Sequence, residues 1–272
     1  MFEFFDKRPD EVNKKIIDSW EESKLHLNAF STDEINQLIK IFKTAPKTNN
    51  MTKQNKMFDD FLNSESVDKT ITPNQRFGQG SGAFSAPVCW DEGSKEILDP
   101  VLKKCIGDYK IVGGTFNMTM NPYRLHTDSG RFKETKIHKQ IIIPLHWDRT
   151  LDVYSILYNQ RWTGCQARFQ RGLSQTSEEK FTTTTHMTIT DYENSQIHNL
   201  TNEPFDSHLY ESLVSHINYE SLWGFSVELA AKWTPRSLIA YDRSVIHSSC
   251  HFASNKLKTK LFITLVTEQP DD

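Results

Sequence analysis

The sequence predicts a mainly β fold with flanking helices, of the sandwich or jelly-roll type. From residue 110 onward, short stretches with strand periodicity follow one another, and few helices separate them. Before residue 110 the periodicity is mostly that of helices. We therefore expect a helical N-terminal support region over residues 1–109 and a β core over residues 110–272. A polar stretch at about residues 191–224 interrupts the strands and is expected to be an insertion.

The N-terminal region is expected to contain three helices. Apolar residues recur at spacings of three and four in two of them, and the third is short; they cover residues 10–22, 31–44 and 95–106. The second begins with a capping box, in which Ser31 or Thr32 is the N-cap and Glu34 supplies the returning carboxylate. Residues 45–58 and 70–93 are polar or rich in turn-forming residues, so we expect exposed connections there.

The strands of the core begin where the period changes to two. Phe116, Met118 and Met120 alternate with polar residues, as in a half-buried strand that continues toward His126. Residues 139–147 contain a continuous apolar run, which is typical of a strand covered on both faces. Further strands are expected at residues 153–158, 166–170, 180–190, 227–233, 237–241 and 260–266, and a helical segment at residues 206–217.

Composition argues against several functional classes. Because 35 Asp and Glu outweigh 32 Lys and Arg, the formal net charge is -3, and no global basic field would recruit nucleic acid or an anionic membrane. No apolar run approaches the roughly 18 residues of a spanning helix, and apolar residues precede the charged ones at the start, the reverse of a secretory signal. We expect a cytoplasmic protein whose 4 cysteines, far apart in the sequence, are reduced.

Two triplets have the pattern of a facial metal site. Two histidines and one carboxylate leave open positions on a ferrous ion, and residues two apart in a strand face the same way. The pattern occurs as His126-Thr127-Asp128 and as His146-Trp147-Asp148, while chance alone gives roughly one such triplet among 10 histidines. The first is favoured because it follows an alternating strand and precedes a polar loop and a buried strand. The second triplet needs no metal to explain it, because His146 would end a strand and Asp148 would begin a turn.

The third ligand is expected from a late strand. His247 follows a strand and a turn in a second short strand, which would return beside the first triplet. His251 is a rival only four residues later, but it lies in a polar loop. The metal site predicted from the sequence is therefore His126, Asp128 and His247.

These motifs, in this order, resemble those of the Fe(II)/2-oxoglutarate-dependent oxygenases. The likeness is strongest to the prolyl-hydroxylase-like and phytanoyl-CoA-hydroxylase-like branches, and it covers roughly residues 110–267. It rests on Tyr123-Arg124-Leu125-His126-Thr127-Asp128, Ile141-Ile142-Ile143-Pro144-Leu145, Gly164, and residues 233–242 followed by His247. The resemblance implies a double-stranded β-helix, a cupin-like jelly roll, that carries the metal triad.

The resemblance also implies the cofactors and the reaction. Fe(II) would be bound by the triad, with 2-oxoglutarate and O2 as co-substrates, and Asp128 would favour hydroxylation or a related oxidation over halogenation. A basic residue on the strand after His247 would bind the distal carboxylate of 2-oxoglutarate. Lys260 is the preferred candidate, since an apolar run follows it, and Lys258 and Lys256 compete with it. Tyr123 and Asn117 are further candidates for co-substrate binding.

Two other functions agree with the same sequence. The domain could be a catalytically silent β-helix that binds a ligand or a protein, because fold does not determine function. It could also be a metal-dependent cupin enzyme that does not use 2-oxoglutarate, in which case Lys260 would have no anion to bind. The expected substrate is a small molecule or a peptide. Nucleic acid is not expected, because no stretch interleaves basic and aromatic residues.

Overall fold

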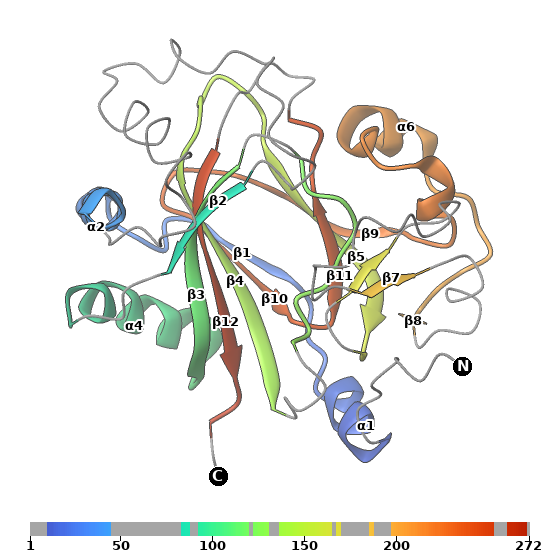
Figure 1. The fold of residues 1–272 in the computed structure, drawn as a ribbon, viewed down its shortest axis with the longest axis horizontal. Coiled ribbons are helices and arrows are strands. Elements are labelled where there is room, and N and C mark those ends of the chain that lie inside the picture. The colour runs from blue at the N-terminus through green and yellow to red at the C-terminus, as the bar shows by residue number, and fades with distance from the viewer. Residues whose placement is uncertain are drawn as a thin grey trace.

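A computed structural model describes residues 10–44, 83–87, 92–119, 122–130, 136–164, 167–169, 185–187, 197–252 and 260–270 of the chain. Two β-sheets face each other, and two helices cover the outer side of the larger sheet (Figure 1). No helix in the described ranges is long and apolar enough to cross a membrane. Of the two cysteines that lie in these ranges, Cys105 and Cys250, both are free thiols.

The larger sheet has six strands in the order β1-β10-β4-β12-β3-β2, and every neighbouring pair is antiparallel. The strands are β1 (Lys24–His26), β2 (Ala83–Pro87), β3 (Lys110–Thr119), β4 (Ile137–His146), β10 (Leu238–Asp242) and β12 (Lys260–Glu268). Strand β12 lies between β3 and β4, so the last strand of the chain is at the centre of this sheet.

The smaller sheet is built around β5. This strand, Tyr154–Trp162, pairs with β11 (Val245–Ser249), β9 (Val227–Lys232) and β8 (Ile197–His198), in each case antiparallel. A parallel pair of short strands, β6 (Ala167–Phe169) and β7 (Thr185–Met187), lies next to it. His126 connects this pair to the smaller sheet, because it forms β-bridges with both Arg168 of β6 and His247 of β11.

The order in which the chain visits the two sheets defines the fold. From β4 in the larger sheet it passes to β5 in the smaller one, and after β9 it returns to β10. It then crosses again to β11 and once more to β12. Alternation of successive antiparallel strands between two facing sheets is the topology of a double-stranded β-helix, or jelly roll. The expected fold class is therefore confirmed.

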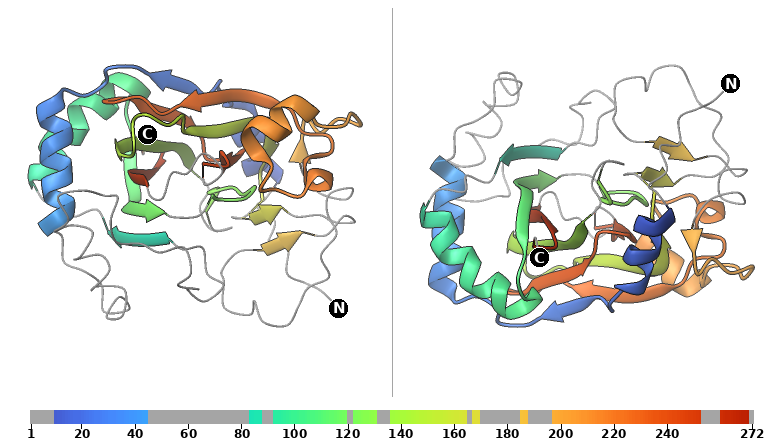
Figure 2. Two further views of the ribbon diagram at one scale, coloured as in Figure 1. Left: turned by 90° about the horizontal axis from the view of Figure 1, so that it is seen from above. Right: turned by 90° about the horizontal axis from the view of Figure 1, so that it is seen from below.

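Apolar side chains form two cores, one on each face of the larger sheet. On the outer face, α2 (Thr32–Thr44) and α4 (Glu92–Ile106) pack side by side on β3, β4 and β12 (Figure 2). The inner core fills the space between the sheets and includes Ile142, Ile156, Tyr158 and Tyr241. The strand β4 contributes to both cores, which explains its continuous apolar run.

The described part of the expected insertion, residues 197–224, packs against the inner core. It contains α6 (Ser207–Leu209), the π-helical turn Tyr210–Val214 and the 3-10 helix Tyr219–Leu222. Phe205, Val214, Ile217 and Leu222 are buried in the core. The region ends at Gly224, whose φ is +82° and where a Cβ would lie 2.4 Å from the carbonyl oxygen of Thr201, so this turn requires glycine.

Comparison with the sequence predictions shows agreement in the core and differences before residue 110. The helix predicted at residues 10–22 is shorter, α1 (Asp10–Asp18). Strand β1 was not predicted, because three residues are too few to show a period. Strand β2 lies within residues 70–93, where an exposed connection was expected; that prediction was wrong, because pairing with β3 overrides a turn-forming composition. The capping box is confirmed, with Ser31 as the N-cap.

Candidate functional site

The segment 122–130 lies between β11 and β6, on the side of the smaller sheet, and carries two of the predicted ligands. Its side chains alternate, so that Leu125, Thr127 and Ser129 are buried beneath it while His126 and Asp128 are only partly buried on the other side. Thr127 accepts a hydrogen bond from the backbone of β6 (3.3 Å), and Ser129 donates one to the carbonyl oxygen of Gly164 (2.8 Å). The buried hydroxyls thus fix the segment, and the alternation directs His126 and Asp128 to the same side.

His247 lies on the neighbouring strand β11, directly opposite His126. Each of the two residues donates its backbone N–H to the carbonyl oxygen of the other, at 3.0 Å and 2.9 Å. Residues that exchange both hydrogen bonds in an antiparallel pair carry their side chains on the same face. The two imidazole rings accordingly lie 4.1 Å apart between centroids.

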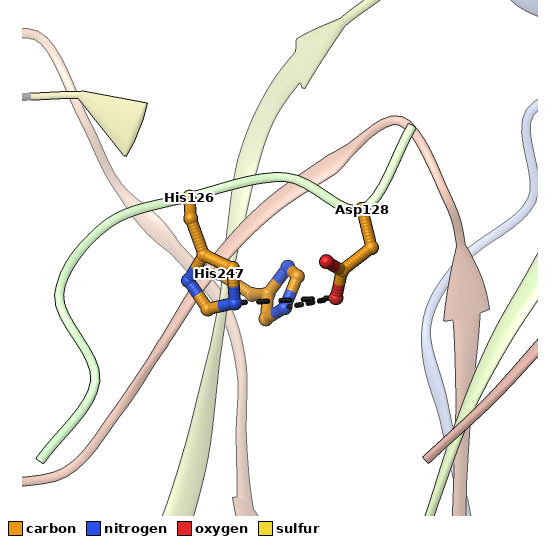
Figure 3. Close-up of side chains that lie close together, drawn as sticks. All are labelled: His126, Asp128 and His247. Carbon is orange, nitrogen blue, oxygen red and sulfur yellow. Dashed lines mark ion pairs between the residues drawn. The ribbon is translucent and has the colours of Figure 1, made fainter. Parts of the chain in front are cut away.

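The three predicted ligands are brought together at one point. Nε2 of His247 lies 3.4 Å from Oδ2 of Asp128, and Nε2 of His126 lies 3.9 Å from the same oxygen (Figure 3). One ligand atom from each residue falls within 4.8 Å of the others. Two atoms that share a first-row divalent ion at about 2.2 Å lie at most about 4.4 Å apart. Both distances to Asp128 meet this requirement.

Backbone contacts determine which nitrogen of each imidazole faces Asp128. Nδ1 of His126 is 2.8 Å from the carbonyl oxygen of Arg124, and Nδ1 of His247 is 3.0 Å from that of Val245. A carbonyl oxygen only accepts, so Nδ1 must carry the proton in each ring. Nε2 then presents a lone pair toward Asp128, which is the arrangement that a metal ligand needs.

Electrostatics favour the charge states that bind a cation. Burial, and then the neighbouring His247, lowers the pKa of His126 to about 4, so this imidazole is neutral at neutral pH. Burial opposes ionisation of Asp128, but the neighbouring imidazoles of His247 and His126 and the guanidinium of Arg243 outweigh it and lower its pKa to about 2. The cluster therefore offers the neutral imidazole of His126 and the carboxylate of Asp128.

Lys260, the first residue of β12, is a buried cation enclosed by aromatic rings. Its side chain belongs to a residue only 4% exposed, and Nζ lies 4.5 Å from the ring centroid of Trp233, 4.6 Å from that of Phe252 and 5.6 Å from that of Phe262. No carboxylate of the described residues forms an ion pair with it. Desolvation lowers its pKa to about 8. A charged lysine in such a place is expected to meet an anion from outside the described residues.

One cavity of about 250 Å³ joins the triad to Lys260. Its walls come from both sheets and also include Tyr123 and Asn117, so six of the seven predicted site residues line it. The seventh, Lys258, and its rival Lys256 are outside the described residues. Further lining residues are Thr115, Thr119, Gln140, Ile142, Ser155, Arg168, Trp233, Tyr241, Ser248, Ser249, Phe262 and Thr264.

The rival candidates do not reach this cavity. Oδ1 of Asp148 accepts hydrogen bonds from the backbone N–H (3.0 Å) and the hydroxyl (2.7 Å) of Thr150, so this carboxylate stabilises a turn. Nδ1 of His251 is 2.7 Å from the hydroxyl oxygen of Ser215, on the helical region that follows α6. Neither residue is among those that line the cavity.

Sequence reasoning missed several polar residues of the cavity, and two of them lie beside the metal-ligand cluster. Gln140 is buried in β4 and donates a hydrogen bond from Nε2 to Oδ2 of Asp128 (2.9 Å). A glutamine at the edge of a continuous apolar run is the signal that could have identified it. Arg168 is the middle residue of β6. No sequence pattern marks it, because its position beside His126 arises from strand pairing alone.

No protein-family model matches the chain, and no curated protein matches it. Several solved structures are similar over most of its length. The carbocyclase SnoK, a non-heme alpha-ketoglutarate-dependent enzyme of nogalamycin biosynthesis, is 9% identical, with a TM-score of 0.48 over 97% of this chain and 85% of that one. The epimerase SnoN of the same biosynthesis is 8% identical, with a TM-score of 0.45 over 96% and 84%. EctD from S. alaskensis, solved with 2-oxoglutarate and 5-hydroxyectoine, is 11% identical, with a TM-score of 0.44 over 99% and 78%.

Proposed function

We propose that the chain is a non-haem Fe(II)/2-oxoglutarate-dependent oxygenase that hydroxylates or otherwise oxidises a small-molecule or peptide substrate. Succinate and CO2 would be released together with the oxidised product. The observation that carries the proposal is the single cavity that contains both the His126, Asp128 and His247 cluster and the buried cation Lys260. A metal cluster alone is common to many enzymes, whereas a buried cation beside it provides for an anionic co-substrate.

The donor set fits a ferrous ion. Two imidazole nitrogens and one carboxylate, without any thiolate, form the set that suits ferrous iron and leaves further coordination positions open. His126, Asp128 and His247 would hold the ion, and Gln140 would orient the carboxylate through its hydrogen bond. When bound, iron together with 2-oxoglutarate supplies the activation of O2 and the oxidising power.

The surroundings of Lys260 fit the distal carboxylate of 2-oxoglutarate. A carboxylate provides the counterion that this ammonium lacks among the described residues, and a charge-assisted contact in a desolvated pocket contributes roughly 1.5–3 kcal/mol. Asn117 and Tyr123 line the same cavity and would contact the co-substrate. Asn117 itself is held in place because its Nδ2 donates to the hydroxyls of Thr115 (3.0 Å) and Thr264 (2.8 Å).

The protein itself positions the metal ligands and shields the co-substrate from water. The backbone pairing of His126 with His247 fixes both imidazoles before any ligand enters. Trp233 and Phe262 shield the Lys260 end of the cavity from water, and this strengthens the charge contact there. Trp233 is itself fixed, because its indole N–H donates a hydrogen bond to the hydroxyl of Ser155 (3.0 Å).

The decisive experiment is incubation of the purified full chain with ferrous iron, 2-oxoglutarate and a metabolite pool in air. We expect release of succinate and a mass shift in one component of the pool, which then names the substrate. Asp128→Ala should abolish both. Lys260→Ala should raise the KM for 2-oxoglutarate by about one to two powers of ten, since each 1.4 kcal/mol corresponds to tenfold.

Metal affinity serves as the control and separates this function from its alternatives. Iron binding should be the same in Lys260→Ala and in the unaltered chain. Metal binding without any effect of 2-oxoglutarate would favour a cupin enzyme that does not use this co-substrate. Absence of metal binding would favour a silent binding domain. Either result would contradict the proposal.

A further inference from the structure

Arg168 is a second cation of the cavity, and it lies at the metal cluster rather than at Lys260. It is the residue of β6 that pairs with His126 in an antiparallel bridge, flanked by the hydrogen bonds from Thr127 N–H to Ala167 O (2.9 Å) and from Phe169 N–H to Leu125 O (3.1 Å). Residues opposite each other in such a pair project to the same face. Arg168 therefore extends the row that His247 and His126 begin, and it lines the cavity.

The guanidinium of Arg168 has no partner within the described part of the chain. No hydrogen bond or ion pair joins it to another described residue, in contrast to the other arginines near the core. Arg161 pairs with Glu228 (2.8 Å), and Arg243 donates from Nε to the carbonyl oxygen of Asp128 (3.0 Å). These two side chains are built into the fold, whereas Arg168 lines the cavity and its guanidinium carries five hydrogen-bond donors.

The charges that the described residues bring to the cavity do not balance without an additional anion. Among the described lining residues, Lys260 and Arg168 are cations and Asp128 is the one carboxylate, which leaves a net positive charge before any ligand binds. A divalent metal ion and the two negative charges of 2-oxoglutarate cancel each other. The loaded site therefore keeps one uncompensated positive charge. Because Lys260 would be neutralised by the co-substrate, that charge resides at Arg168.

We infer that Arg168 binds an oxyanion group of the substrate, a carboxylate or a phosphate. The inference rests on the proposed function and narrows the substrate class to molecules that carry such a group near the bond to be oxidised. Arginine suits this task because its planar fork binds a carboxylate or a phosphate through two parallel hydrogen bonds. Its place beside His126 would hold the anionic group next to the metal.

The test uses small probes in matched charged and neutral pairs. The full chain is loaded with ferrous iron and saturating 2-oxoglutarate without oxygen, so that the metal and Lys260 are occupied. Benzoate, 3-phenylpropanoate and phenyl phosphate are then titrated by calorimetry against benzamide, 3-phenylpropanamide and phenol. We expect at least one oxyanion to bind more tightly than its neutral partner. Arg168→Gln should weaken that binding at least tenfold, and Arg168→Lys, which keeps the charge but not the fork, should weaken it less.

Controls separate failure of this inference from failure of the proposed function. Binding of 2-oxoglutarate to the iron-loaded chain is measured first, and it should be the same in Arg168→Gln. If 2-oxoglutarate does not bind, the proposed function is contradicted; the oxyanion titration is then made on Lys260→Met without co-substrate, where Arg168 is the remaining described cation of the cavity. If no oxyanion binds, or if Arg168→Gln binds it equally well, the role of Arg168 is overturned.

Discussion

The side-chain amide of Gln140 donates a hydrogen bond of 2.9 Å to Oδ2 of Asp128, the same oxygen that faces both histidines. Gln140 is 2% exposed and lies on β4 of the larger sheet, so this contact ties the carboxylate to a strand at the core of the fold. The amide therefore decides which lone pair of Asp128 remains for a metal.

Gln140→Leu should lower the affinity for ferrous iron by about 10-fold to 100-fold, as removal of a partner that orients a metal ligand typically does. The substitution keeps the approximate volume but removes the donor. Calorimetric titration with the metal measures the effect, and circular dichroism checks that the strands are retained. An unchanged affinity would show that Asp128 needs no support from this side.

Asp128→Ala should lower the metal affinity more than this, by over about 100-fold, because a direct ligand is lost. The rival triplet provides a matched control, since Asp148 follows a histidine with the same spacing but hydrogen-bonds to a turn. Asp148→Ala should leave metal binding unchanged. If the two variants exchanged these outcomes, the site would have been assigned to the wrong triplet.

Lys260→Met should stabilise the chain at pH 7, at the expense of co-substrate binding. The folded pKa of about 8 lies below the ordinary value of 10.5, so the unfolded chain binds more protons between these values and burial of the charge costs about 3 kcal/mol below pH 8. The stability of the unaltered chain should accordingly rise between pH 8 and pH 10.5. Urea unfolding at pH 7 and pH 10 measures both effects.

The stabilising effect of Lys260→Met should shrink to under about 1 kcal/mol at pH 10. The folded lysine is then neutral, and only the remaining protonation of the unfolded chain, with its ordinary pKa of 10.5, still favours unfolding. Lys103, an exposed lysine on α4, provides the control. Lys103→Met should change the free energy of unfolding by less than about 0.5 kcal/mol at either pH. A gain at pH 10 as large as that at pH 7 would mean that packing, and not charge, limits stability at Lys260.

Ser31→Ala should destabilise the chain by about 1 kcal/mol through loss of the N-cap of α2. The hydroxyl of Ser31 accepts the N–H of Glu34 at 3.2 Å, and Glu34 accepts the N–H of Ser31 at 2.6 Å. The neighbouring Thr32 is exposed and makes no such contact, so Thr32→Ala should cause no loss. Urea unfolding compares the two variants, and an equal effect would contradict the capping assignment.

The core of the fold was predictable because its signals are local. Alternation around Phe116 and the apolar run before Leu145 each reflect the faces of one strand, and both strands are present as β3 and β4. The spacing of His126 and Asp128 is likewise a property of one extended segment. Strand β2 was not predictable, because its pairing with β3 depends on residues more than 25 positions away and not on its own composition.

The candidate site was predictable only in part for the same reason. His247 was predicted because the first triplet required a distant third ligand. No sequence pattern predicts the strand pairing that places Arg168 beside His126. Gln140 was missed because it lies in a strand that was predicted from its apolar run. The aromatic enclosure of Lys260 combines Trp233, Phe252 and Phe262 from separate segments, so only the folded chain reveals that this lysine is buried.

The reciprocal backbone hydrogen bonds between His126 and His247 make the cluster sensitive to chain length rather than to composition. Deletion of one residue from positions 122–125 would place Thr127 opposite His247, and it would turn the two other ligands toward the buried side. Deletion of two residues would turn His126 and Asp128 back toward the cavity, but each would be displaced by two positions along the strand relative to His247. Related chains that keep this cluster should therefore differ by substitution between Pro122 and Asp128, and insertions or deletions should fall in the connections outside that stretch.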